Sequence, residues 1–218
     1  MIVNQFTMHT VGEVPASVHI GTDALAVSHS GVAVYTQSLS NCVGVVVHNP
    51  AGRTGCLGHM SPPDGNDAQT QCALAGAFLD YCIRLQLGIS RDDVTTRGQL
   101  EVYITGGRGR GAAFATGWAS ALTSEKIPVA NWYEGLNLTV AARIQLTGAL
   151  GVQNPAPPGG TMVAYEPHSG QVWVSSDTSL VAQRTEATTQ EAVKHNMYVA
   201  TQVKSPALQA GWMKYLFG

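Results

Sequence analysis

The stretch that decides the fold is Thr36–His59, which reads "TQSLSNCVGVVVHNPAGRTGCLGH". Its centre, Val43–Val47, is an apolar run rich in β-branched residues, a pattern typical of a strand that is buried on both faces. Residues 48–52 have the composition of a turn, and the chain then returns through Arg53–Leu57 as the expected hairpin partner. The segment therefore predicts an antiparallel pair of strands inside a sheet.

Similar short apolar segments, each closed by Gly, Pro, Asn or Asp, recur along the chain and predict further strands. The predicted strands are Ser17–Ile20, Gly31–Thr36, Cys42–His48, Leu100–Thr105, Gly160–Tyr165 and Gln171–Ser175. Apolar and small residues at helical spacing predict helices at Asn66–Gln86, Gly117–Leu122 and Asn137–Leu150. This order favours an α+β fold, with short strands in two layers of a β-sandwich or mixed sheet and helices packed on one outer face.

The composition changes after Ser176 to Thr, Gln, Ala and scattered charges. This change predicts one domain over residues 1–176 and an appended C-terminal arm over 177–218. The arm ends in an aromatic cluster, Trp212, Tyr215 and Phe217. We expect this cluster to dock on the body of the chain or on a second copy.

Composition excludes several classes of function. The formal net charge is −2, only 12% of the residues are charged and no Lys/Arg run is present, so a nucleic-acid or anionic-membrane surface is not expected. No stretch reaches the about 20 apolar residues that span a bilayer, and the first residues lack the pattern of a signal peptide. A cytoplasmic location is therefore expected, with secretion as an effector left open. The four cysteines form no CxxC pair, and neither a metal nor a cofactor is predicted.

A candidate nucleophile lies where the polar turn Gln37–Asn41 meets the apolar strand. Backbone N–H groups at such a junction can hold an oxyanion near the Cys42 thiol, because the strand ladder has not yet begun. His59 follows 17 positions later, where a hairpin returns to the start of the outgoing strand. An imidazole that takes the thiol proton yields the reactive thiolate. The spacing thus suggests a Cys42–His59 pair, and Thr36 either fixes the imidazole tautomer or contacts the substrate.

Structural roles compete with this interpretation. A single Cys near a strand is more often a core residue, and a single His after a turn is more often structural. We expect His48 and His168 to be solvated turn residues. Cys56 is expected to pack in the core, although pairing with Cys42 stays open.

The stretch Gly106–Gly111, "GGRGRG", superficially resembles a phosphate-binding loop. It lacks the Lys-Ser/Thr of a P-loop and the spacing of a dinucleotide fingerprint, so a tight turn is expected instead. Arg108 or Arg110 stays a candidate for contact with an acidic substrate surface.

The stretch "VHIGTDALAVSHSGVAVYTQSLSNCVGVVVHNPAGRTGCLGHMSPPD" resembles the N-terminal half of the CheD family, the chemoreceptor glutamine deamidases. The signature of that family places a Thr six positions before the Cys and a His 17 positions after it, as Thr36, Cys42 and His59 are placed here. The resemblance continues in "LEVYITGGRG", "LNLTVAARIQLTGALGV" and "GGTMVAYEPHSGQVWV", which are similar to a strand ending in Gly-Gly, a helix and a closing hairpin of the family.

The resemblance implies that Cys42 attacks the carboxamide of a protein glutamine, that ammonia leaves after protonation by His59, and that water hydrolyses the thioester to glutamate. The substrate would be a chemoreceptor or another protein, since the catalytic domain of the cytotoxic necrotizing factor toxins shares this Cys-His arrangement. Ser40-Asn41 replaces the family's usual Gly-Ser, and we expect these two residues to contact the substrate or the oxyanion. The segment 108–135 looks longer than in the family, and 177–218 has no counterpart. A non-catalytic CheD-like module that binds a protein through these two segments is the alternative.

Overall fold

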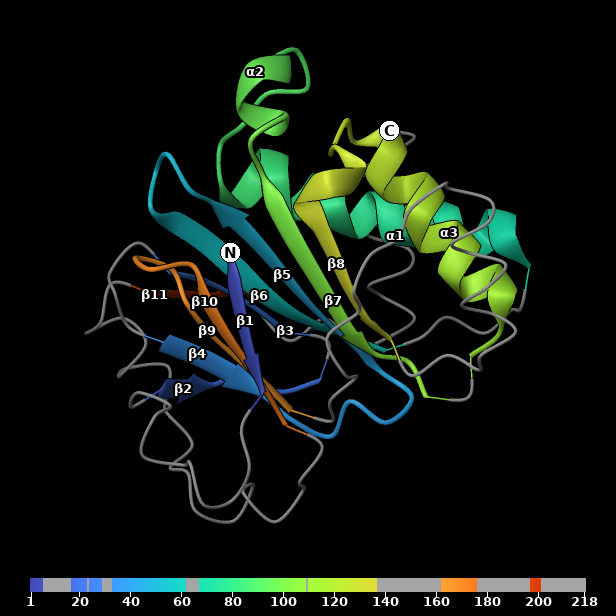
Figure 1. Ribbon diagram of the computed structural model, residues 1–218, viewed down its shortest axis with the longest axis horizontal. Coiled ribbons are helices and arrows are strands. Elements are labelled where there is room, and N and C mark those ends of the chain that lie inside the picture. Colours follow the sequence, from blue (N-terminus) through green and yellow to red (C-terminus); the bar gives the residue numbers. More distant parts are fainter. Residues whose placement is uncertain are drawn as a thin grey trace.

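The computed structural model describes residues 1–5, 17–22, 24–28, 33–61, 67–108, 110–136, 162–175 and 197–200. These residues form two β-sheets, with helices beside one of them (Figure 1). The predicted α+β class is confirmed. The helix predicted at Asn137–Leu150, and all of the 177–218 arm except 197–200, lie outside the described residues.

The larger sheet has six strands in the order β11-β3-β6-β5-β7-β8. Their bounds are β3 Ala24–Ser28, β5 Val43–Asn49, β6 Thr54–Met60, β7 Glu101–Gly106, β8 Trp132–Leu136 and β11 Met197–Ala200. Strands β5 and β6 form the predicted antiparallel hairpin, and β7 pairs with the other edge of β5. The central position of β5 explains its apolar run Val43–Val47, because both of its faces are covered.

The smaller sheet has five strands in the order β1-β10-β9-β4-β2. Their bounds are β1 Ile2–Gln5, β2 Ser17–His19, β4 Ala33–Thr36, β9 Met162–Glu166 and β10 Gln171–Ser175. Strand β10 has the predicted bounds, and β9 and β10 form the predicted closing hairpin. Strand β4 pairs with β9, so a strand from the first fifth of the chain lies beside one from its last third.

The two sheets pack face to face around one apolar cluster. From the larger sheet, Val46, Leu57 and Tyr103 point into this layer, and from the smaller sheet Val163 and Val172 point back. Burial of each such side chain stabilises the folded state by about 1.5–3 kcal/mol of free energy. The sheets therefore form a sandwich whose interior is closed by contacts between distant parts of the sequence.

Helices cover the other face of the larger sheet. The covering helices are α1 Ala68–Asp80, continued by the π-helix η2 Tyr81–Gln86, and α3 Ala112–Ser124. Two short helices, α2 Val94–Arg97 and η3 Val129–Asn131, precede β7 and β8 in the chain. Phe78 of α1 and Trp118 of α3 join the core formed with Val45 and Val47 of β5. Figure 1 shows α1 and α3 on the same side of β7 and β8. Among the described helices, none has the length and hydrophobicity needed to cross a lipid bilayer.

The segment 108–135 is part of the folded core. It forms α3, which packs in the helix-side core, and nearly all of β8, which pairs in parallel with β7. Four described residues of the predicted arm, Met197–Ala200, pair with β3 at the edge of the larger sheet. Both segments therefore contribute structure to the sandwich where they are described.

Candidate active site

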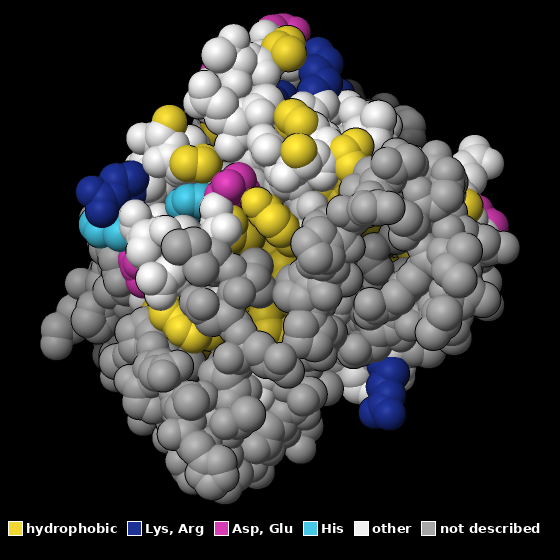
Figure 2. Space-filling model, viewed as in Figure 1, with side chains coloured by type: hydrophobic (Ala, Val, Ile, Leu, Met, Phe, Trp, Pro, Cys, Tyr) yellow, Lys and Arg dark blue, Asp and Glu magenta, His cyan; other side chains and the backbone are white. Residues whose placement is uncertain are grey.

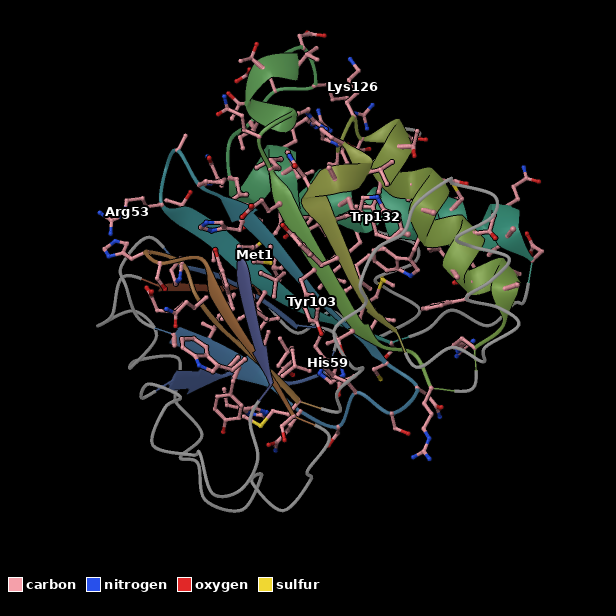
Figure 3. The ribbon with its side chains drawn as sticks, viewed as in Figure 1. Met1, Arg53, His59, Tyr103, Lys126 and Trp132 are labelled. Atoms are coloured by element: carbon pink, nitrogen blue, oxygen red, sulfur yellow. The ribbon has the colours of Figure 1, made fainter. Side chains whose placement is uncertain are left out.

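A hydrogen bond between the two sheets links Thr36 to His59. Thr36 is the last residue of β4 in the smaller sheet, and His59 is the penultimate residue of β6 in the larger one. The Thr36 Oγ1 lies 2.7 Å from the His59 Nδ1. Thr36 is fully buried and His59 is 2% exposed, so water competes little for this bond. Figure 3 places the labelled His59 at one end of the sandwich, close to where several strands end.

The tautomer of His59 follows from a second bond of the same hydroxyl. The Thr36 Oγ1 donates its single proton to the carbonyl oxygen of Ile20 at 2.9 Å. The Thr36 oxygen must then accept from the imidazole, so Nδ1 carries a proton. In the neutral ring, Nε2 is consequently the basic nitrogen. Of the two roles predicted for Thr36, the structure provides the contact with the imidazole.

Cys42 immediately precedes β5 and packs in the layer between the two sheets, into which His59 also points. The residue paired with His59 across the β5–β6 hairpin is Gly44, two positions after Cys42. We infer from this register that Cys42 and His59 are close neighbours, since diagonal residues of an antiparallel pair have Cα atoms about 7–8 Å apart. Cys42 is half-buried and packs against the apolar layer between the sheets. The fold therefore brings thiol and imidazole to one end of one layer.

Glycine at position 44 leaves room for this arrangement. A Cβ atom there would approach Leu39 Cδ1 to 2.7 Å and Val163 Cγ1 to 2.9 Å. Both contacts are closer than packed carbon atoms tolerate. Leu39, although it belongs to a polar turn, is fully buried and fills the space directly over the strand.

The consecutive glycines Gly106 and Gly107 lie against the loop before Cys42. Gly107 donates its backbone N–H to the Cys42 carbonyl at 2.8 Å, and Arg108 donates its own to the Ser40 carbonyl at 2.5 Å. Gly106 has φ +94, and a Cβ at this residue would lie 2.4 Å from the Cys42 carbonyl oxygen. Only glycine combines this backbone conformation with so close an approach. The sequence predicted a tight turn here, but its contact with Cys42 had no local signal.

Ser40 and Asn41 are exposed residues of the bend that precedes β5. The chain reaches this bend through Ser38, which has φ +63. Ser40 and Asn41 are adjacent to Cys42 in the chain, and their contact with a substrate or an oxyanion stays a prediction.

The prediction for His48 is wrong. His48 belongs to β5, is 5% exposed, and its Nδ1 lies 2.8 Å from the Tyr165 hydroxyl. Burial lowers the pKa of His48 below its ordinary value of 6.5. His168 is exposed in the β9–β10 turn, as predicted.

Cys56 packs in the core, as expected. It lies on the helix-facing side of β6, beside Cys82 of η2, while Cys42 belongs to the layer between the sheets. Burial and the hydrogen bond with Cys56 raise the pKa of Cys82 well above its usual range. All four cysteines lie in the described ranges, and none of them forms a disulfide bond. Within the described ranges, no cluster of three His, Cys, Asp or Glu side chains is arranged to hold a metal ion.

Comparisons of the sequence and the fold with known proteins add little to this geometry. No protein-family model matches the chain, and no curated protein is similar to it in sequence. Among solved structures, YlmD from Geobacillus stearothermophilus is similar over 61% of this chain at 12% identity and a TM-score of 0.36. The match spans 57% of the YlmD chain, little more than half of its length. A likeness this weak supports no inference about function, and none of the comparisons confirms the resemblance to the CheD family.

Proposed function

We propose that this protein is a thiol-dependent protein-glutamine deamidase with a CheD-like fold, in which Cys42 is the nucleophile and His59 the proton carrier. The observation that supports the proposal is the bond between Thr36 and His59. It leaves Nε2 as the basic nitrogen of an imidazole that shares the layer between the sheets with the only cysteine at that end of the described sandwich.

In the proposed reaction, the Cys42 thiol gives its proton to His59 Nε2, and the thiolate attacks the carboxamide carbon of a glutamine side chain. The tetrahedral oxyanion forms beside the Ser40-Asn41 bend, where backbone N–H groups or the Asn41 amide would stabilise it. The imidazolium returns its proton to the amide nitrogen, and ammonia leaves. An amide nitrogen is a poor leaving group until it is protonated, so the acid must stand beside the nucleophile.

The second half of the reaction uses the same histidine. Neutral His59 takes a proton from water, and the hydroxide attacks the thioester carbon. The C–S bond breaks, the thiolate recovers the proton, and glutamate is released. The Nδ1–H bond to Thr36 keeps the ring oriented through both proton transfers, and the imidazolium retains that bond because Nδ1 is a donor in both states.

The proposed substrate is a protein, either a chemoreceptor of the same cell or a protein targeted by a secreted effector. Conversion of Gln to Glu adds a negative charge to the target, so its consequence there would be electrostatic. The rate enhancement would come from proton transfer and oxyanion stabilisation, since no cofactor is required by this scheme.

The test is incubation of the protein with a cell lysate, followed by a proteome-wide search for Gln-to-Glu conversions. We expect a set of conversions that disappears with Cys42→Ala and persists with Cys72→Ala, which removes another half-buried thiol. Conversions that persist in Cys42→Ala would assign the activity to another site. A wild-type protein that produces none, while it retains partners from the lysate, would favour the non-catalytic binding module.

A further inference from the structure

We propose that Arg108 and Arg110 form a cationic rim beside Cys42 that selects glutamines flanked by carboxylates. This inference rests on the proposed deamidase function and names its substrate class: an acidic protein segment. It is carried by the backbone contacts of the 106–108 turn and by the absence of acidic partners for these two arginines in the described residues.

The fold fixes Arg108 next to the nucleophile. Its backbone N–H bonds to the carbonyl of Ser40, two residues before Cys42, while Gly107 bonds to the carbonyl of Cys42 itself. Two consecutive residues of the turn are thereby held against the loop that presents the thiol. The Arg108 side chain is exposed at this position, so a protein segment bound at Cys42 would meet it.

Neither arginine has its charge neutralised within the described ranges. Neither has a carboxylate oxygen within 4.0 Å there, and Arg110 lies with its guanidinium carbon 5.9 Å from the centre of the Phe114 ring. Three other arginines behave differently. Arg84, Arg91 and Arg97 approach the buried Asp80 carboxylate to 3.3, 2.9 and 3.7 Å.

The surroundings add to the positive potential. Helix α3 begins at Ala112, two residues after Arg110, with no acidic side chain in its first turn and no side-chain cap. The N-terminal end of this helix carries the positive end of the helix dipole. The loop 37–41 and the turn 106–111 contain no Asp or Glu. A carboxylate on the substrate would therefore be attracted to this rim, most strongly at low ionic strength.

Other exposed cations offer a matched control because they lie far from the site. Figure 3 labels Arg53 and Lys126, and both lie well away from His59. Figure 2 shows basic side chains at separate places around the visible face, without one continuous patch. Lys126 is exposed and forms no ion pair with a described residue, so Lys126→Glu makes at a remote place the same change of charge as Arg108→Glu or Arg110→Glu alone.

The first experiment measures the electrostatic potential around the Cys42 thiol and needs no substrate. The rate of Cys42 alkylation by anionic iodoacetate is divided by the rate with neutral iodoacetamide, for each variant at low salt. We expect this ratio to fall roughly threefold to tenfold for each reversed arginine, in Arg108→Glu and Arg110→Glu singly and in their double variant, and to stay unchanged in Lys126→Glu. A ratio that is unchanged in the double variant, or that falls equally in Lys126→Glu, overturns the inference.

The second experiment reads the sequence context of the glutamines that the wild-type protein converts in a lysate. We expect Asp and Glu to be enriched within a few positions of these glutamines, and the double variant to lose that enrichment. Conversions without acidic enrichment would overturn the inference and leave the deamidase proposal standing. A charge effect on alkylation without any conversions would contradict the deamidase proposal and leave an anion-attracting thiol.

Discussion

Two buried histidines face the same layer of the sandwich, and each bonds through Nδ1 to a hydroxyl of the opposite sheet. His59 bonds to Thr36 at 2.7 Å, and His48 bonds to Tyr165 at 2.8 Å. His59 pairs with Gly44 of β5, and His48 lies four residues further along the same strand. The sandwich thus contains two imidazole–hydroxyl contacts of the same kind, one toward each end.

The two histidines differ in what lies near the other ring nitrogen. At His48, the β9–β10 turn closes over Nε2, because a Cβ on Gly170 would lie 2.5 Å from that atom. At the His59 end, Cys42 packs in the same layer, immediately before β5. An imidazole held by a hydroxyl is therefore no sign of catalysis by itself in this fold. Under the proposed function, the neighbouring thiol is what distinguishes the catalytic role of His59 from the structural role of His48.

The largest effect is expected from exchanging each histidine for glutamine. His59→Gln removes the base and acid of the proposed reaction, and deamidation should fall by about 10²–10⁴-fold. His48→Gln should retain activity, because its ring serves packing and a hydrogen bond. Gln-to-Glu conversion in a lysate, quantified by mass spectrometry, measures both. Equal loss of activity in two folded variants would remove the distinction between the histidines.

The next effect concerns the glycine turn that holds Cys42. Gly106→Ala forces a Cβ against the Cys42 carbonyl at φ +94, and we expect a cost of about 3 kcal/mol in the free energy of unfolding. Gly88→Ala is the matched control, since Gly88 has φ +70 but no atom within 4 Å of a Cβ, and its expected cost is about 1 kcal/mol. Denaturant unfolding measures both costs. Equal costs would show that the close contact with Cys42 contributes nothing.

Removing the hydroxyl of Thr36 or that of Tyr165 tests what each imidazole–hydroxyl bond contributes. Thr36→Val leaves the His59 Nδ1–H and the Ile20 carbonyl without their buried partner, which we expect to cost about 1–3 kcal/mol in stability and to reduce activity. Thr36→Ser, which keeps the hydroxyl, should restore activity. Tyr165→Phe should destabilise the fold with activity per folded molecule unchanged. Thermal unfolding and deamidation rates together separate these outcomes, and a fully active Thr36→Val would exclude a positioning role.

The smallest effect is a pH dependence of stability that arises at His48. Because burial lowers the pKa of His48 below 6.5, the unfolded chain binds a proton more readily than the folded one. The contribution of neutral His48 is present above pH 6.5 and is lost as the pH falls through the lowered pKa of the folded state. Unfolding free energies measured across this interval should decline less in His48→Gln than in the wild type. An identical decline in both would assign the effect to other groups.

The sequence predicted those parts whose signals are local. The β5–β6 hairpin follows from a valine run and a turn, and β10 has the predicted bounds of Gln171–Ser175. The helix predicted at Asn66–Gln86 was also recognisable from the helical spacing of its apolar residues and from Gly88 after its end, which has φ +70.

Other parts depend on partners that are distant in the sequence. Strand β3, Ala24–Ser28, is short and made of small residues, and it is a strand because β6 and β11 flank it. Strand β8 contains Glu and Gly within Trp132–Leu136 and is defined by its pairing with β7. His48 was misjudged as solvated because Tyr165, its partner, lies 117 positions further along the chain. The spacing of Thr36, Cys42 and His59 was visible, whereas the Ile20 carbonyl that sets the tautomer was not.

The most direct test of the central claim compares two thiols in one sample. Cys42 and Cys72 are both half-buried, and burial raises the pKa of Cys72, so Cys72 serves as an internal reference. Peptide-resolved alkylation with iodoacetamide near pH 6.5 should modify Cys42 at least about tenfold faster than Cys72, and His59→Gln should abolish this difference. A Cys42 that reacts no faster than Cys72 in the wild type, or equally fast in folded His59→Gln, would contradict activation of the thiol by this imidazole.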